Sequence, residues 1–374
     1  MSSSSSTIAA VRETKSQEGR VGLTPAGVAQ LVATGHRVLV EKHAGAKAGH
    51  SDASYVASGA ELVDQETAWG AADLVVKVKE PIPSEYRFFR DGLTLFTYLH
   101  LSSLPDLTRA LVDARVTAIA YESVSVDGRT LPLLAPMSEI AGRIAPQVSA
   151  RFMLAPEGGP GVLLGGATGV APSRVTVIGA GVVGANAAKI ALGLGAHVRL
   201  LDVSVERLAQ VETQLGGRVE CVMSSASKIE ESVVASDLVI GAVLLPGARA
   251  PRLVSEDVVK AMRPGALLCD VAVDQGGCFE TTRPTSHADP VYLKHDVIHY
   301  AVTNIPGSAP VTATAALTNA TFPFVRDLAT SGVREALASS PALRNGLTTA
   351  NGKVTAQAVA SEQGYDFVPG EEAL

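Results

Sequence analysis

The sequence predicts an α/β protein of two domains, each built on a mainly parallel sheet covered by helices. Three observations carry this prediction. Strands and helices alternate from the N-terminus to residue 120, and a second alternation begins at residue 174. Helical stretches follow both series. Alternating strands and helices are typical of sheets whose two faces are both covered by helices.

Length and composition agree with this prediction and exclude several classes of protein. At roughly 150 residues per domain, 374 residues suggest two or three domains. Hydrophobic residues make up 47% and charged residues 18%, which excludes global disorder. A net charge of −6 without a block of lysine and arginine argues against a nucleic-acid-binding protein. No apolar run is long enough for a transmembrane helix, so no membrane partner is expected.

The N-terminus and the cysteines predict a cytoplasmic protein. Met1 and the serines after it form neither a basic nor an apolar segment, so they do not resemble a secretory signal. Cys221, Cys269 and Cys278 have no metal-ligand spacing and form no plausible disulfide framework, which favours a reducing compartment.

The first series opens with a short apolar strand at Thr7–Val11. Thr24 and Pro25 then begin a helix, because threonine caps unpaired N–H groups and proline fits the first helical position. Gly35 ends this helix. Further strands are predicted at Arg37–Glu41, Ala71–Lys79, Leu93–Leu101 and Val116–Ala120.

The second series has six predicted strands. Helices are expected at Gly184–Leu194 and Val205–Gln214. The strands are predicted at Arg174–Ile178, His197–Asp202, Val219–Met223, Ser236–Ala242, Gly265–Val271 and Val297–Val302. Six strands at this spacing are what a Rossmann sheet requires.

Two helical stretches flank this second series, at Pro136–Ala155 and from about Ala309 to Thr330. The chain is therefore expected to leave the first domain, build the second and return. We predict a discontinuous domain of residues 1–135 and 308–374, and an inserted Rossmann domain of residues 136–307. A cleft between two such Rossmann-like domains would be the natural place for a substrate.

A glycine-rich turn directly follows the first strand of the second series. Gly179, Gly181 and Gly184 form a GxGxxG sequence that opens a helix, and Asp202 ends the next strand. Gly179 permits the tight turn, Gly181 lets the backbone approach a pyrophosphate, and Gly184 lets helix and strand pack closely. The arrangement predicts a dinucleotide site.

Asp202 favours NAD over NADP, because a carboxylate accepts hydrogen bonds from ribose hydroxyls and repels a 2′-phosphate. Arg207 keeps the alternative open, since it could meet a 2′-phosphate or stack near the adenine. Polar and apolar residues at other strand ends are expected to complete the site. They are Ser224, Val243, Leu244, Asp274 and Asn304.

Polar side chains also follow apolar runs of the first series. Strand alternation puts Lys77 and Lys79 on one face of a strand, and Tyr98 and His100 on one face of the next. Arg20 lies on a loop before a helix cap. Taken singly, the lysines suit a solvated strand edge, His100 a buried imidazole with satisfied hydrogen bonds, and Arg20 a surface charge.

Taken together, these residues suit a substrate site. Arg20 and Lys79 can hold a carboxylate and polarise a carbonyl, and His100 can act as general base. A nicotinamide cofactor needs such groups, because hydride leaves a carbon as the attached N–H or O–H loses a proton.

Eight segments, extending over nearly the whole chain from Glu13, match a known family. They are GRVGLTPAGV (19–28), DLVVKVKEP (73–81), LFTYLHL (95–101), LLAPMSEIAGR (133–143), VIGAGVVG (177–184), DLVIGAVLLPGARAP (237–251), DVAVDQGGCFETTRPT (270–285) and ALTNAT (316–321). In these segments the chain resembles the alanine dehydrogenase family, which is related to the NAD-binding subunit of proton-translocating transhydrogenase.

The resemblance implies NAD-dependent oxidative deamination of L-alanine to pyruvate and ammonium. It implies His100 and Asp274 as the catalytic pair and Arg20 and Lys79 as substrate-carboxylate residues. It also implies a homohexamer, and no metal, because the region around Ser331 lacks a histidine that some relatives use in a metal site. The cofactor residues it implies are Ser138, Val182, Val183, Asp202, Arg207, Ser224, Val243, Leu244, Val271, Ala272, Val273, Asp274, Arg283, Val302, Thr303, Asn304 and Ile305.

The sequence leaves three alternatives open. The chain could be the nucleotide-binding subunit of a transhydrogenase, although it ends without hydrophobic segments. It could oxidise another amino acid such as glycine, serine or lysine, although Met137 and Tyr98 suit a small side chain. It could also be a dinucleotide sensor without catalysis. Turnover of L-alanine with NAD⁺ would separate the first prediction from all three.

Overall fold

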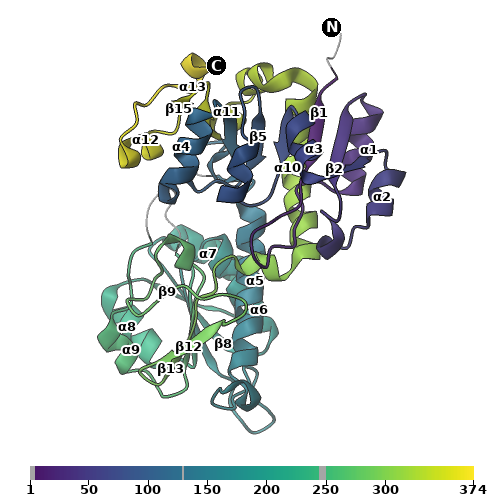
Figure 1. Cartoon of the computed structure of the whole chain (residues 1–374). Coiled ribbons are helices and arrows are strands. Elements are labelled where there is room, and N and C mark those ends of the chain that lie inside the picture. The colour runs from purple at the N-terminus through teal and green to yellow at the C-terminus, as the bar shows by residue number, and fades with distance from the viewer. Residues whose placement is uncertain (1–4, 129, 244–249) are drawn as a thin grey trace. The chain divides into compact units, whose positions relative to one another are not determined.

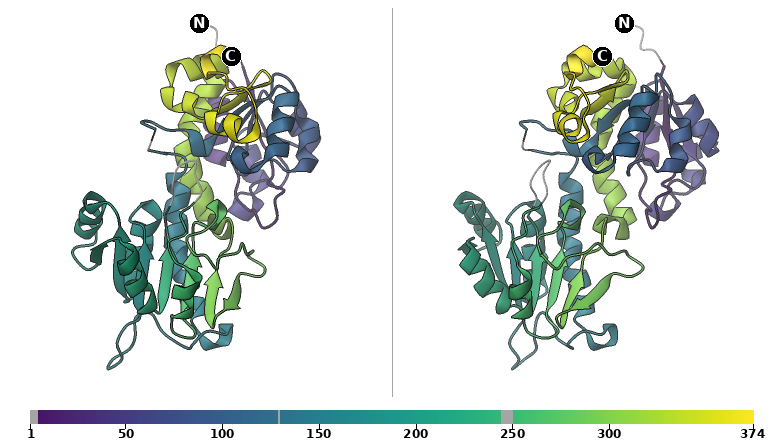
Figure 2. Two further views of the ribbon diagram at one scale, coloured as in Figure 1. Left: turned by 90° about the vertical axis from the view of Figure 1, so that its left-hand side faces the viewer. Right: turned by 60° about the vertical axis from the view of Figure 1, so that its left-hand side comes forward.

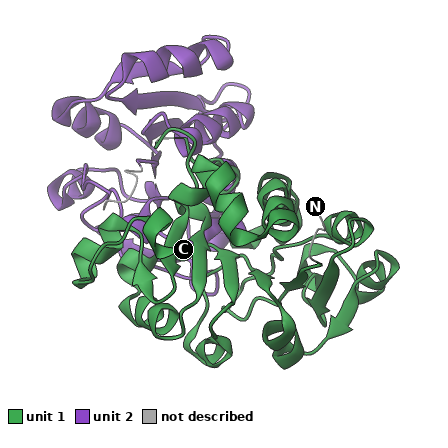
Figure 3. Cartoon of the chain, turned by 90° about the horizontal axis from the view of Figure 1, so that it is seen from above, with its two compact units in different colours: residues 1–137, 307–374 green, residues 138–306 purple. Residues whose placement is uncertain are grey.

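The computed structural model describes residues 5–128, 130–243 and 250–374. The chain divides into two compact units, shown in different colours in Figure 3. Unit 1 comprises residues Met1–Met137 and Gly307–Leu374, and unit 2 comprises Ser138–Pro306. The chain passes from unit 1 to unit 2 within one helix, α5 (Ala135–Phe152).

Among the described residues, unit 1 has a sheet of eight strands in the order β15-β14-β6-β5-β4-β1-β2-β3. The pairs from β6 to β3 are parallel, whereas β14 pairs antiparallel with both β6 and β15. The strands are β1 (Thr7–Ala10), β2 (Arg37–Glu41), β3 (Glu61–Val63), β4 (Leu74–Val76), β5 (Thr94–Thr97), β6 (Thr117–Ala120), β14 (Leu347–Ala350) and β15 (Lys353–Val354).

The helices of unit 1 surround this sheet (Figure 1). They are α1 (Pro25–Ala33), α2 (Asp52–Ala57), α3 (Gln65–Ala71), α4 (Pro105–Asp113), α10 (Pro310–Ser339), α11 (Pro341–Asn345), α12 (Gln357–Gln363) and α13 (Gly370–Ala373). The predicted cap of α1 forms, because the Thr24 side chain accepts a hydrogen bond from the Gly27 N–H. A core on one face of the sheet joins Val75 and Leu95 to Trp69 of α3 and Leu111 of α4.

The described part of unit 2 has a sheet of seven strands in the order β12-β13-β11-β10-β7-β8-β9. Without β12 this is the strand order of a dinucleotide-binding Rossmann sheet. The strands are β7 (Arg174–Ile178), β8 (His197–Asp202), β9 (Glu220–Met223), β10 (Leu238–Gly241), β11 (Leu267–Asp270), β12 (Val291–Lys294) and β13 (Val297–Tyr300). The helices are α6 (Val182–Gly193), α7 (Val205–Gln214), α8 (Ala226–Val234) and α9 (Glu256–Lys260).

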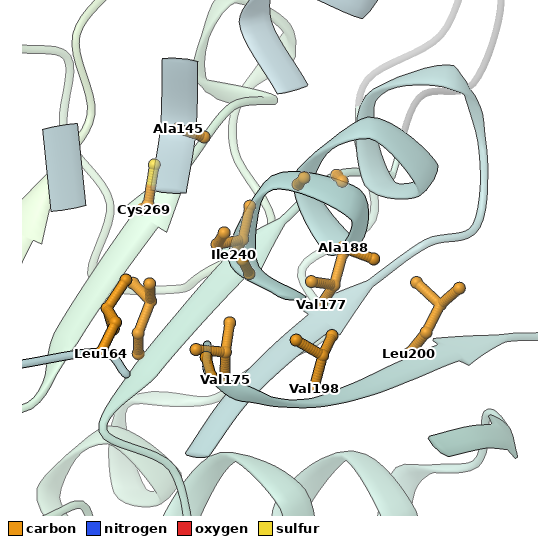
Figure 4. Packing of buried hydrophobic residues seen from close by; sticks show 14 of the residues in the cluster. Ala145, Leu164, Val175, Val177, Ala188, Val198, Leu200, Ile240 and Cys269 are labelled. Carbon is orange, nitrogen blue, oxygen red and sulfur yellow. The ribbon is translucent and has the colours of Figure 1, made fainter. Parts of the chain in front are cut away.

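Helices cover both faces of this mainly parallel sheet (Figure 2). Alternate residues of one strand therefore enter different cores. Ile240 packs with Ala145 of α5 and Ala188 of α6, as Figure 4 shows in close-up. Its neighbour Val239 packs on the opposite side with Val233 of α8.

The α/β class and the two sheets are confirmed, but the predicted strands need corrections. The unit 2 sheet has a seventh strand, β12, which pairs antiparallel with β13 at the sheet edge. The strand predicted at 71–79 forms only at Leu74–Val76, and the strand predicted at 93–101 ends at Thr97. Within the described residues, no helix is both long and apolar enough to cross a membrane.

Candidate active site

The glycine-rich turn of unit 2 has the geometry that its sequence predicts. Gly179 follows β7 with φ 104°, in the left-handed region that favours glycine. A Cβ atom at Gly184 would lie 1.7 Å from the Gly179 carbonyl oxygen, so no side chain fits there. Val182 and Val183 form the first turn of α6, directly after Gly181. The backbone N–H groups at the start of this helix can receive a pyrophosphate.

Asp202 holds this turn in place from the end of β8. Its Oδ2 accepts a hydrogen bond of 2.6 Å from the Ala180 N–H, and its Oδ1 accepts one of 2.8 Å from Ser204. The Ser224 N–H donates to the Asp202 carbonyl at 2.8 Å, which joins the end of β9 to the same place. Asp202 therefore both shapes the glycine turn and offers a carboxylate beside it.

Arg207 also binds the turn, because its Nη2 donates to the Ala180 carbonyl at 2.9 Å. Val243 lies against the turn, with its Cγ2 3.1 Å from the place of a Cβ atom at Gly179. Val203 and Val205 are strongly exposed beside Asp202, an apolar surface suited to a flat base. Leu244, expected here too, lies outside the described residues.

Apart from Arg283, the other predicted cofactor residues lie on three further segments of unit 2. Ser138 lies on α5, half-buried. Val271, Ala272 and Val273 lead from β11 to Asp274, whose carboxylate is exposed and accepts a hydrogen bond of 3.4 Å from the Asn304 N–H. The third segment follows β13 and comprises Val302, Thr303, Asn304 and Ile305, of which Val302 and Ile305 are buried.

Arg283 stacks on an aromatic ring. Its guanidinium carbon lies 4.1 Å from the centroid of the Tyr292 ring, and its backbone N–H donates to the Tyr292 hydroxyl at 2.9 Å. The Tyr292 ring in turn stacks on His299, with 4.8 Å between the ring centroids. The side chain of Arg283 is thus held against a supported aromatic surface.

In unit 1, Arg20 is buried rather than a surface charge, with a side chain only 2% exposed. Its Nε and Nη2 donate to the two carboxylate oxygens of Glu18 at 2.7 and 2.6 Å. Burial alone would lower the pKa of Arg20, but the Glu18 carboxylate raises it. Its Nη1 lies 3.0 Å from the Met137 sulfur. This fork fixes a permanent positive charge in one orientation.

A hollow of about 470 Å³ in unit 1 borders Arg20. Residues 12–20, His43, Ala44, Ala46 and Lys47 line it.

The two lysines predicted on one strand face have separate roles, because β4 ends at Val76 before either of them. Lys77 is completely buried, 2.7 Å from Glu13 and 3.4 Å from Glu85. Burial opposes its charge, but the two carboxylates raise the pKa of Lys77. Lys79 pairs with Glu80 at 3.3 Å, and its side chain is 11% exposed. Lys77 is therefore a buried structural cation, whereas the Lys79 side chain keeps some contact with solvent.

His100 lies beyond the end of β5 with φ 49°, so it does not belong to the strand face predicted for it. Glu122 supports this unusual backbone, because its Oε1 accepts a hydrogen bond of 2.6 Å from the His100 N–H. The same oxygen lies 3.9 Å from His100 Nδ1. The ring is parallel to that of Tyr98 at 6.0 Å and its side chain is 42% exposed, so the imidazole can reach a ligand.

Tyr98 is buried in unit 1, and its hydroxyl donates to the Leu133 carbonyl at 2.5 Å. Burial raises the pKa of Tyr98, which keeps the phenol protonated.

The sequence did not point to the acids that position these groups. Glu13 and Glu122 lie far along the chain from their partners, Lys77 and His100. Only Glu18 is near its partner in the sequence, since it precedes Arg20 by two residues. Within the described part of the chain, no group of three or more His, Cys, Asp or Glu side chains could hold a metal ion.

Family comparisons match almost the whole chain. Residues 9–141 match the description "Alanine dehydrogenase/PNT, N-terminal domain", and residues 145–357 match "Alanine dehydrogenase/PNT, C-terminal domain".

Curated relatives and solved structures agree. The chain is 53% identical to alanine dehydrogenase of Bacillus subtilis (strain 168), over 97% of this chain and 96% of that one. It is also 53% identical to alanine dehydrogenase 2 of Staphylococcus aureus (strain USA300), over 97% and 98%. A solved L-alanine dehydrogenase superposes with a TM-score of 0.92 at 49% identity, covering 95% of this chain and 98% of that one. A transhydrogenase from Sinorhizobium meliloti gives a TM-score of 0.80 at 25% identity, covering 94% and 99%.

Proposed function

The chain belongs to the alanine dehydrogenase and pyridine nucleotide transhydrogenase family, and from that premise we propose how its residues catalyse the NAD-dependent oxidative deamination of L-alanine. The reaction is reversible: L-alanine, NAD⁺ and water give pyruvate, ammonium, NADH and a proton. The observation that carries this function is the 53% identity to a curated alanine dehydrogenase over 97% of this chain.

The residues of the glycine turn suit the pyrophosphate of NAD. A Cβ atom at Gly181 would meet none of the described atoms within 4 Å, which leaves room for a phosphate, and Gly184 lets α6 pack closely behind the turn. The Asp202 carboxylate suits ribose hydroxyls and repels a 2′-phosphate, which favours NAD. Bound NAD⁺ supplies a hydride acceptor. Unit 2 would thus be the cofactor domain and unit 1 the substrate domain.

Arg20 binds the substrate carboxylate in this proposal. The two hydrogen bonds from Nε and Nη2 of Arg20 to Glu18 hold the guanidinium in one orientation. Lys79 stabilises the negative charge that develops on the oxygen atom bonded to Cα once water has added.

His100 and Asp274 move the protons. The substrate amine must be neutral before hydride leaves Cα, which produces an iminium. A water molecule deprotonated by His100 or Asp274 then adds to this carbon, and proton transfer to nitrogen expels ammonia. A general acid or base contributes typically ~10²–10⁴-fold, so loss of either side chain should nearly abolish turnover.

The test compares wild type with His100→Ala and Asp274→Asn in two assays. NADH formation from L-alanine and NAD⁺ should be lost in both variants, while NADH fluorescence titration should show retained cofactor binding. Turnover that survives in one variant contradicts the role given to that residue. Parallel reactions with glycine, L-serine, L-lysine and NADP⁺ test the substrate and cofactor preferences.

The second candidate function is that of a nucleotide-binding transhydrogenase subunit, because a solved transhydrogenase shares the fold over 94% of this chain. Its identity of 25% is half that of the alanine dehydrogenases. Binding of NADH without any pyruvate formation from L-alanine would favour it.

Assembly and location are parts of the proposal. We propose a homohexamer from the family resemblance, and light scattering would measure its mass. We also propose a cytoplasmic location, because Cys221, Cys269 and Cys278 are all unbridged thiols.

A further inference from the structure

The loop after β11 turns around one buried carboxylate. Asp270 is the last residue of β11 and is 1% exposed. Its Oδ1 accepts a hydrogen bond of 3.2 Å from the Ala272 N–H. Its Oδ2 accepts one of 2.9 Å from the Cys278 N–H and one of 2.5 Å from the Thr282 hydroxyl. One side chain therefore joins the beginning, the middle and the end of the segment 271–282.

The backbone between these contacts is adapted to the carboxylate. Val273–Gln275 forms a single 3₁₀ turn, and Gly276 and Gly277 follow with φ of 100° and 81°. A Cβ atom at Gly277 would lie 2.5 Å from Asp270 Oδ2, so only glycine lets the chain pass this close. The Gly277 N–H returns to the Ala272 carbonyl at 3.1 Å.

This loop carries Asp274 and ends beside Arg283. The Asp274 side chain is exposed, and within unit 2 it accepts a hydrogen bond of 3.4 Å from the Asn304 N–H. Its position therefore depends on the backbone of the loop. That backbone is set by hydrogen bonds to Asp270.

A buried carboxylate is costly unless donors compensate it. Burial raises the pKa of Asp270 to about 6, against the opposing effect of the Thr282 hydroxyl and the backbone N–H groups. The electrostatic neighbours of Asp270 are the thiols of Cys269 and Cys278 and the phenol of Tyr292. Thr282 is thus its one side-chain donor among the described residues, and a hydroxyl can be removed without changing the size of the side chain.

We propose that Asp270 and Thr282 are positioning residues, which hold the loop 271–282 in the conformation that binds the nicotinamide cofactor and presents Asp274. This inference rests on the proposed function for the role of Asp274, but its effect on cofactor binding does not require turnover.

The experiment compares three substitutions of neighbouring threonines. Thr282→Val keeps the shape and removes the donor to Asp270, whereas Thr282→Ser keeps the donor. Thr281→Val is the control at the neighbouring position. Thr281 is buried and Thr282 half-buried, and the Thr281 hydroxyl contacts His299 Nε2 at 2.7 Å rather than Asp270. NADH affinity is measured by fluorescence titration, kcat and the KM for pyruvate by steady-state kinetics, and folding by thermal unfolding.

We expect Thr282→Val to weaken NADH binding and to lower kcat, each by about tenfold or more, because small displacements of positioned groups have large effects. The KM for pyruvate at saturating NADH should stay within about twofold, since Arg20 and Lys79 belong to unit 1 and are independent of this contact. Thr282→Ser should restore wild-type values. Thr281→Val should lower the unfolding temperature and leave NADH affinity unchanged.

Wild-type NADH affinity in Thr282→Val, or an equal loss in Thr281→Val, would overturn the proposal. Asp270→Asn gives a second measurement, since its amide would face the Ala272 N–H, and it should also weaken NADH binding. If the wild type binds NADH but does not oxidise L-alanine, the proposed function fails while the comparison of NADH affinities still decides the role of Thr282.

Discussion

Lys77 is the residue whose loss should cost unit 1 most stability. Its ammonium compensates the Glu13 and Glu85 carboxylates, and all three side chains are 1% exposed. Lys77→Met keeps the length and apolar stem of the side chain but leaves two buried carboxylates without their cation. Removing one partner from a buried ion pair costs about 3–5 kcal/mol.

Urea unfolding followed by tryptophan fluorescence measures this loss. Trp69 is the sole tryptophan of the chain and is completely buried in unit 1, so its signal reports the unfolding of that unit. With a slope of about 2 kcal/mol per molar urea, the midpoint should fall by ~2 M. The double variant Lys77→Met with Glu13→Gln should recover part of the loss, because one uncompensated charge is gone.

Lys228→Met is the matched control, since Lys228 pairs with Glu231 on the exposed surface of α8. It should not shift the midpoint measurably, because exposed pairs contribute little. A loss below about 1 kcal/mol in Lys77→Met, with an unchanged slope, would refute the reasoning that the cluster is a compensated buried network.

Four further predictions follow from individual contacts. Lys79 and a second lysine hold the pKa of Glu80 down to about 2 despite its burial, so Glu80→Gln should lose about 3 kcal/mol of stability near neutral pH. This difference from wild type should shrink as the pH falls from 4.5 towards 2 in urea unfolding at several pH values, and a pH-independent difference would contradict it. Gly184→Ala should abolish NADH binding in a fluorescence titration, while Gly193→Ala on the same helix, with open space around it, should not. Asp202→Asn should lower the ratio of the KM for NADP⁺ to that for NAD⁺ by about tenfold, or ~1.4 kcal/mol, and an unchanged ratio would remove its role in cofactor choice. Glu18→Gln should raise the KM for pyruvate with little change in NADH affinity, and an unchanged KM would show that the guanidinium does not need this carboxylate.

The Rossmann part of the fold was predictable from local signals. Three local patterns each predict one structure. They are the glycine turn, the β-branched strand before it and the acid that ends the next strand. The structure has the corresponding strand, helix and turn. Strand β12 was missed because it is a short, half-exposed edge strand whose pairing with β13 depends on a tight turn at His295 and Asp296, both with positive φ. Neither residue is the usual glycine of such a turn.

The candidate site was predicted in part. Arg20, Lys79 and His100 were singled out by residue type, but strand alternation gave wrong surroundings for Lys77 and His100. The alternation fails because the backbone leaves the strand at Val76 and at Thr97. The supporting acids come from distant segments, such as Glu122 beside His100 and Glu13 beside Lys77, and no local pattern indicates such pairs.

The ratio of the three products distinguishes oxidative deamination of L-alanine from cofactor binding alone. Purified protein is incubated with L-alanine and NAD⁺, and NADH, pyruvate and ammonium are measured in the same sample over time. The account predicts equal amounts of the three products, with none formed when L-alanine or NAD⁺ is omitted. Bound NADH without formation of pyruvate and ammonium would contradict it.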